Sequence, residues 1–141
     1  MLEISRAEKN CNPGNIRRST DMFNGEVRPS RDREFKQFTD MDYGFRAMWA
    51  VLKSYYYRHH RKTIRQIISR WAPAEDKCNH VNAYVNFVAE KSGHGADEPL
   101  KFNYEGMGSV VLAMAQFESG YVRNTWEGHC RKGFDLLFRK H

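Results

Sequence analysis

Residues 107–117 form an almost uninterrupted run of apolar side chains, MGSVVLAMAQF, which constrains the fold more than any other segment. A helix that is apolar on every side is stable only when other elements surround it. The run is well short of the roughly 20 apolar residues that cross a bilayer. The sequence therefore predicts a buried central helix with the rest of the chain packed around it.

The chain has 141 residues, which is enough for one domain with a real core. Apolar residues make up 40% of the chain and aromatic residues 13%, and these fractions exclude a disordered chain. We expect a single domain over residues 1–141, with its core at about 10–138. The first residues, MLEISRAEKN, lack an apolar segment of the kind found in signal peptides, and no segment predicts a membrane span.

Apolar residues at helical spacing predict further helices around the central one. Asp40 or Asp42 can cap the first of them. Thr63 can cap the second, which should end ahead of Pro73, and Gly93 should end the third. The expected helices cover about 42–58, 63–72, 81–91, 107–117 and 126–139, with a loop at 93–103.

Residues 10–40 are rich in turns and predict a small sheet of two or three strands. The NPGN segment at 12–15 is a turn in which proline fixes one dihedral angle and glycine permits a positive one. Asn24-Gly25 is the strongest short hairpin signal, and residues 34–38 alternate as a strand does. The whole pattern predicts an α+β fold that is mainly helical with a small β-hairpin sheet.

The net charge of +6 favours polyanionic partners such as nucleic acid, anionic lipid or cell-wall polymers. The densest basic run, RHHRK at 58–62, is either the solvated end of a helix or a binding patch. Three widely spaced cysteines, Cys11, Cys78 and Cys130, do not indicate a disulfide framework. Cys78 and His80 lack a second ligand pair, so we expect no metal site and no cofactor.

Glu118 is the sharpest candidate for chemistry, because it closes the apolar helix just before Ser119-Gly120. A carboxyl group at the edge of an apolar core loses hydration, which favours its neutral form. A neutral carboxylic acid is what a general acid acting on a glycosidic oxygen requires. The alternative is a glutamate at a helix end that points into water.

Other polar and aromatic side chains could build a sugar-binding groove around this acid. Asn12 and Asn15 offer donors and acceptors that suit N-acetyl groups and hydroxyls, and Arg17 follows them. The alternative is a structural turn whose asparagines bond only their own backbone. Sugar rings stack on aromatic faces, and the candidates for that role are Tyr43, Trp71 and Tyr84.

Glu26, just past the Asn-Gly turn, is the candidate for a second catalytic carboxylate. Glycosidases with two carboxylates use one to protonate the leaving oxygen and the other to activate water or stabilise positive charge. The alternative is an exposed charge next to a hairpin turn.

Six blocks in this order resemble a family of small phage- and prophage-encoded proteins of Bacteroidetes, often described as phage structural proteins with a lysozyme-like domain. The blocks are NPGNIR (12–17), NGEVRPS (24–30), EFKQF (34–38), YGFRAM (43–48), TIRQIISRWAP (63–73) and LAMAQFESG (112–120). The resemblance covers about residues 10–120 and implies a lysozyme-like, peptidoglycan-degrading domain. Three positions depart from the family pattern, since Cys11, Asp76 and Ser119 stand where asparagine is usual.

The chain is also similar to flagellar-type glucosaminidases and lytic transglycosylases, in which a helix ends in the catalytic glutamate of a Glu-Ser-Gly motif. A segment of Asn-Leu-Phe-Gly-Ile-Lys type follows in those enzymes, whereas here the related turn at 12–17 comes first. This order resembles a circular permutation of the lysozyme core. The resemblance implies that Glu118 is the catalytic acid and that the turn at 12–17 forms a groove wall, so we expect the two to pack together.

The sequence therefore predicts a muralytic enzyme, such as an endolysin, that cleaves the N-acetylmuramic acid–N-acetylglucosamine backbone by hydrolysis or lytic transglycosylation. Its expected partner is bacterial peptidoglycan, with anionic wall polymers as a second class and with no nucleic acid. A virion, a holin or a secretion machine would deliver it to the wall. The alternatives are a peptidoglycan endopeptidase, a non-catalytic virion or wall-binding module, and a nucleic-acid-binding protein favoured by charge alone.

Overall fold

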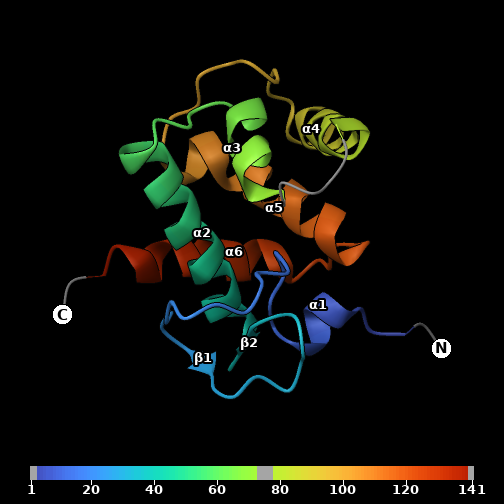
Figure 1. The fold of residues 1–141 in the computed structure, drawn as a ribbon. Helices are drawn as coiled ribbons and strands as arrows, with labels where there is room; N and C mark the ends of the chain where they lie inside the picture. The colour runs from blue at the N-terminus through green and yellow to red at the C-terminus, as the bar shows by residue number, and fades with distance from the viewer. Residues whose placement is uncertain (1–2, 73–77, 140–141) are drawn as a thin grey trace.

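The computed structural model describes residues 3–72 and 78–139. In this part of the chain the protein is mostly helical with one small antiparallel sheet, which confirms the expected α+β class (Figure 1). The elements are α1 (Arg6–Lys9), β1 (Glu26–Val27), β2 (Gln37–Phe38), α2 (Met41–Arg58), α3 (Ile64–Trp71), α4 (Cys78–Ser92), α5 (Tyr104–Ser119) and α6 (Trp126–Leu137). None of the helices described here combines the length and apolarity needed to cross a membrane.

The apolar run forms α5, the buried central helix that its composition predicts. Its fully buried side chains include Met107, Val110, Val111 and Met114. Asn103 caps its start by accepting a hydrogen bond from the Gly106 N–H, and Gly120 ends it with a left-handed φ of 91°. Both α4 and α6 pack against α5. The helix is longer than expected at both ends, so Glu118 lies inside its last turn.

The longest helix, α2, packs along α6, which runs across the molecule behind it (Figure 1). Trp49 of α2 is fully buried and donates its indole N–H to the Cys130 carbonyl of α6 at 3.1 Å. A Cβ on Gly133 would lie 2.6 Å from the Arg46 backbone nitrogen, so only glycine permits the approach of the two helices there. This pair forms one wall of the core around α5.

Two of the helix starts expected from the sequence, those at Asp40 and Thr63, are confirmed by their caps. Asp40 accepts a hydrogen bond from the Tyr43 N–H at 3.1 Å, and Thr63 forms a reciprocal capping box with Gln66. Ala72 leaves α3 in an extended conformation, with ψ of 140°, as a residue before proline prefers. Pro73 itself lies outside the described residues.

The hairpin expected at Asn24-Gly25 is wrong in one respect. The dipeptide does form a turn, in which Gly25 has φ of 77°, but only its second side continues as a strand. That strand, β1, pairs with β2 in the register Glu26↔Phe38 and Val27↔Gln37. In the segment before the turn, the backbone carbonyls of Ser19 and Asp21 accept hydrogen bonds from the side chains of Arg28 and Lys36. These carbonyls therefore have partners without pairing in a sheet.

The short helix α1 has no counterpart in the sequence prediction, and Asp32 is one of the groups that join it to the rest of the chain. The Asp32 carboxylate accepts hydrogen bonds from Arg6 at 2.6 and 2.7 Å and from Asn10 at 3.0 Å. It also accepts the backbone N–H groups of Glu34 and Phe35 at 2.8 and 3.0 Å. Arg6 first, and then these other donors, hold the pKa of Asp32 well below its usual range.

Asp32→Asn should therefore lower the free energy of unfolding by about 2 kcal/mol at pH 7, because charge-assisted hydrogen bonds are lost. The pKa of Asp32 is lowered in the folded state, so its contribution is fully present above the unfolded pKa of about 3.9 and decreases progressively as pH falls from there through the folded pKa. Urea unfolding at pH 7 and pH 3 measures both effects. Asp97→Asn is the control, since Asp97 forms only an exposed pair with Arg65. Equal stability of the two variants at pH 7 would contradict this role for Asp32.

Candidate functional site: the groove around Glu118

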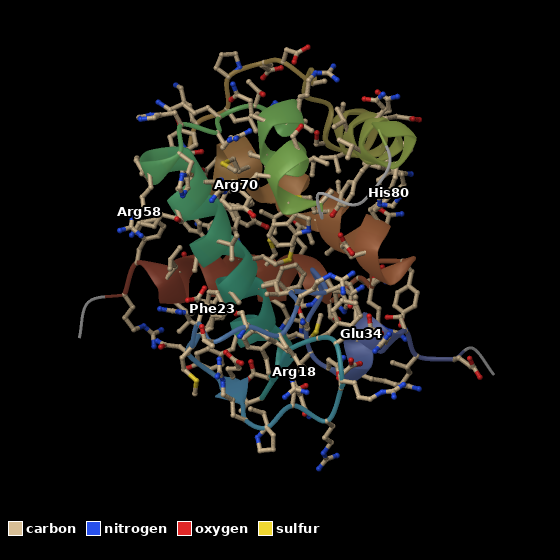
Figure 2. The ribbon with its side chains drawn as sticks, in the orientation of Figure 1. Arg18, Phe23, Glu34, Arg58, Arg70 and His80 are labelled. Atoms are coloured by element: carbon tan, nitrogen blue, oxygen red, sulfur yellow. The ribbon has the colours of Figure 1, made fainter. Side chains whose placement is uncertain are left out.

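A groove with a volume of about 660 Å³ opens at the end of α5, and we call it the Glu118 groove. Its walls come from the 12–17 turn, from Phe35 two residues before β2, and from helices α2, α3, α4 and α5. The lining residues are Asn15, Ile16, Arg17, Phe35, Val51, Tyr55, Ser69, Arg70, Trp71, Ala72, His80, Tyr84 and Glu118. Arg70 and His80 lie in the half of the molecule opposite the sheet, whereas Arg18 and Glu34 lie in the half that holds it (Figure 2).

Glu118 is held in this groove by donors from two other helices. Tyr84 of α4 donates its hydroxyl to Glu118 Oε2 at 2.9 Å, and Trp71 of α3 donates its indole N–H to the same oxygen at 3.2 Å. Because Oε2 accepts both hydrogen bonds, the proton of the neutral acid belongs on Oε1. The two donors therefore fix the orientation of the carboxyl group and leave it one defined protonation site.

The surroundings of Glu118 favour its protonated form. Burial raises its pKa above the ordinary value for glutamate, and this effect outweighs the hydrogen bonds from Tyr84, Trp71 and Asn15 and the charge of His80, which lower it. Burial, followed by the nearby Glu118, also raises the pKa of Tyr84 well above its ordinary value, so this hydroxyl stays a donor. Glu118 thus has the property that a general acid needs.

The expected packing of the 12–17 turn beside Glu118 is confirmed. Asn15 donates its side-chain N–H to the Glu118 carbonyl at 3.0 Å, although 103 residues separate them in sequence. Asn15 adopts a left-handed φ of 49°, which asparagine tolerates better than most residues. Its Oδ1 atom is buried and has no hydrogen-bond partner in the described part of the chain.

Close backbone contacts with α2 and α3 hold this turn in place. A Cβ on Gly44 of α2 would lie 2.0 Å from the Cys11 carbonyl oxygen, so glycine is required where the turn crosses the helix. A Cβ on Gly14 would lie 2.9 Å from side-chain atoms of both Met48 and Trp71. The turn therefore packs directly against Trp71, whose indole N–H binds Glu118. The packing of α2 and α3 sets the position of the turn.

The structure corrects the placement expected for Asn12, which is fully buried inside the turn rather than on the groove wall. Its amide donates to the carbonyls of Ile16 at 3.0 Å and Lys36 at 2.9 Å, and its Oδ1 accepts the Ile16 N–H at 2.9 Å. Every polar atom of the side chain is used internally. Asn12 shapes the turn, and Asn15 and Arg17 are the polar residues of the turn that reach the groove.

Glu26 also lies away from the Glu118 groove. Its side chain is 4% exposed and forms ion pairs with Lys36 at 3.0 Å and Arg28 at 2.9 Å. Burial raises the pKa of Glu26, but hydrogen bonds from Lys36, the Phe23 N–H and Arg28 together bring it below its ordinary value. Glu26 is therefore the counterion of a buried lysine, and this arrangement does not place it where a second catalytic carboxylate would act.

Of the three aromatic candidates, Trp71 and Tyr84 line the groove and Tyr43 does not. Tyr43 lies at the start of α2, where its side chain fills the space in which a Cβ of Gly25 would stand. Trp71 and Tyr84 act on Glu118 through hydrogen bonds, and the Tyr84 ring also stacks on Phe117 with centroids 3.9 Å apart. They therefore position the acid as well as lining the groove.

Sequence reasoning missed the groove positions of Arg70 and His80. Both are adjacent to residues that the sequence did single out: Arg70 precedes Trp71, and His80 lies four residues before Tyr84 on the same helix. Residues four apart share a helix face, so a groove position for Tyr84 also predicts a groove position for His80. Cys11 and Cys130 are free thiols, while the side chain of Cys78 lies outside the described residues.

Comparison with known proteins places the chain among phage proteins. No protein-family model matches it. It is 34% identical over 139 residues to Protein P5 of Pseudoalteromonas phage PM2, a match that covers 96% of this chain and 84% of the phage protein. The chain belongs to the family of that phage protein, which confirms the expected phage relationship.

Proposed function

We propose that this protein is a lysozyme-like muralytic enzyme that cleaves the N-acetylmuramic acid–N-acetylglucosamine backbone of peptidoglycan, as the resemblance of its sequence blocks implies. The observation that carries the proposal is the environment of Glu118. A carboxyl group with a raised pKa lines a groove of about 660 Å³, and two donors from different helices fix its orientation. Such a group is suited to protonate a glycosidic oxygen.

In the proposed reaction, Glu118 Oε1 gives its proton to the leaving oxygen as the glycosidic bond breaks. The carboxylate that remains is stabilised by the Tyr84 hydroxyl and the Trp71 indole N–H, which already bind Oε2. In the described part of the chain, no other Asp or Glu lines the groove. This favours lytic transglycosylation, in which a hydroxyl of the sugar itself attacks the anomeric carbon and gives its proton to the Glu118 carboxylate, so no second carboxylate is required.

The 12–17 turn offers contacts for the sugar. Asn15 and Arg17 both line the groove, and their side chains carry polar groups of the kind that bind N-acetyl groups and hydroxyls. A phage relative also fits this function, because a phage must open the host wall and can deliver the enzyme in its virion or through a holin.

Digestion of purified peptidoglycan tests the proposal. We expect the wild-type protein to release soluble muropeptides with anhydro ends, identified by mass spectrometry. Reducing ends would indicate hydrolysis, and new amino groups would indicate an endopeptidase. Binding to the wall without any released fragment would contradict the enzyme and favour a non-catalytic virion or wall-binding module.

A further inference from the structure

Two arginines line the Glu118 groove, although the glycan backbone that it is proposed to hold is uncharged at most positions. Arg17 stands over the Phe35 ring at 5.3 Å and forms a 3.5 Å ion pair with Glu34, in which both side chains are more than half exposed. Arg70 stands over the Tyr55 ring at 5.4 Å. In the described part of the chain, no carboxylate lies within ion-pairing distance of Arg70.

A chain of contacts joins Arg70 to the acid. The Arg70 guanidinium packs on Tyr55, and Tyr55 meets Trp71 edge to face with ring centroids 6.4 Å apart. Trp71 in turn donates to Glu118 Oε2 at 3.2 Å. The Arg70 guanidinium therefore lies in the groove that would hold the glycosidic bond. The rings of Tyr55 and Trp71 separate it from Glu118. Stacking on an aromatic ring also orders a guanidinium before any ligand arrives.

The segment that follows α2 strengthens the positive charge at this wall. Arg70 Nη2 lies 3.4 Å from His59 Nε2, and the basic run at 58–62 continues from there. Partial desolvation, and then the charges of Arg70, Arg58 and Arg61, lower the pKa of His59. His59 is thus mostly neutral at pH 7, and its ring nitrogen can accept a hydrogen bond from Arg70. An anion that enters the groove here meets a guanidinium that no carboxylate of the described residues neutralises.

We propose, on the basis of the function proposed above, that Arg70 binds a carboxylate of the peptide stem carried by N-acetylmuramic acid. The groove then takes peptide-bearing glycan strands in preference to bare ones. An arginine is suited to this task because its planar guanidinium can donate two parallel hydrogen bonds to one carboxylate. The peptide stem is also the feature that gives peptidoglycan, unlike an unsubstituted N-acetylglucosamine polymer, a row of free carboxylates along its strands.

The test compares two ligands that differ only in the peptide. Soluble glycan strands, and the same strands after an amidase has removed their peptides and the freed lactyl carboxylates have been converted to neutral methylamides, are titrated calorimetrically into the Glu118→Gln variant, which prevents turnover. We expect the peptide-bearing strands to bind about tenfold more tightly at low salt, as one charge-assisted contact provides. Adding Arg70→Ala should remove this preference. Adding Arg65→Ala should keep it, because Arg65 lies on the same helix, is paired with Asp97 and does not line the groove.

A second measurement reads the site directly. The pKa of His59, followed by NMR, should rise toward its ordinary value when peptide-bearing strands bind, and should not change with bare strands. Equal affinity for the two ligands, a preference that survives Arg70→Ala, or no binding of either would overturn the inference. Tighter binding of a DNA oligonucleotide than of either strand would also overturn it, in favour of a nucleic-acid surface. If the wild-type protein releases no fragment from purified peptidoglycan, the proposed enzymatic function fails as well, which separates that outcome from failure of the Arg70 inference alone.

Discussion

Glu118→Gln is expected to abolish wall lysis and leave the fold intact. Glutamine keeps the shape of the side chain and can still accept the hydrogen bonds from Tyr84 and Trp71, but it has no proton to transfer. General acid catalysis is worth roughly a hundred- to ten-thousand-fold in rate, so the loss should fall in that range. Release of soluble fragments from purified peptidoglycan measures it. Glu105→Gln is the matched control, since Glu105 is exposed in the first turn of the same helix and does not line the groove.

Stability and pH dependence separate this catalytic role from a structural one. The pKa of Glu118 is raised in the folded state, so its favourable contribution is present below the unfolded pKa of about 4.3 and is lost as pH rises through the folded value. At pH 7 the substitution should therefore not lower the melting temperature, and wild-type activity should fall as pH rises through the pKa of Glu118. Lysis by Glu118→Gln within about threefold of wild type would exclude Glu118 as the general acid.

The helical framework was predictable because its signals are local. The apolar run at 107–117, the caps at Asp40 and Thr63, and the stop at Gly93 each depend on neighbours within one or two turns. The proximity of the 12–17 turn to Glu118 was predictable for a different reason, namely the resemblance to enzymes in which the two motifs meet. A circular permutation of the lysozyme core would place the two ends of the chain close together. In this structure α1 and the end of α6 lie on opposite sides of the molecule, so the chain ends do not show that arrangement (Figure 1).

The features that the sequence could not predict depend on contacts between distant segments. The helix α1 is a single turn held by Asp32, and isolated turns of helix are too short to give a periodic signal. Lys36 is 1% exposed, whereas the alternating pattern of residues 34–38 does not reveal that a lysine faces inward. Its partner Glu26 lies ten residues away, and only the pairing of β1 with β2 brings the two charges together. Asn12 turned inward for the same kind of reason, because Lys36 supplies one of its acceptors.

The buried pair makes a large and specific prediction for Glu26. Glu26→Gln should lower the free energy of unfolding by about 3–5 kcal/mol, because it leaves the Lys36 ammonium buried without its main counterion. That is a large share of the roughly 5–15 kcal/mol that stabilises a typical domain, so lytic activity should fall with the folded fraction. Urea unfolding followed by tryptophan fluorescence measures the stability, and the peptidoglycan digest measures the activity.

Loss of activity in Glu26→Gln alone would therefore not show that Glu26 takes part in the chemistry, and a second substitution decides the matter. Lys36→Met in the same chain removes the stranded charge, and replacing both partners of a buried pair is often neutral or stabilising. We expect the double variant to regain most of the stability and, with it, most of the lytic activity. A double variant that folds as well as the wild type but releases no muropeptides would instead make Glu26 a catalytic carboxylate. It would also move the reaction toward hydrolysis with two acids, with reducing ends on the products.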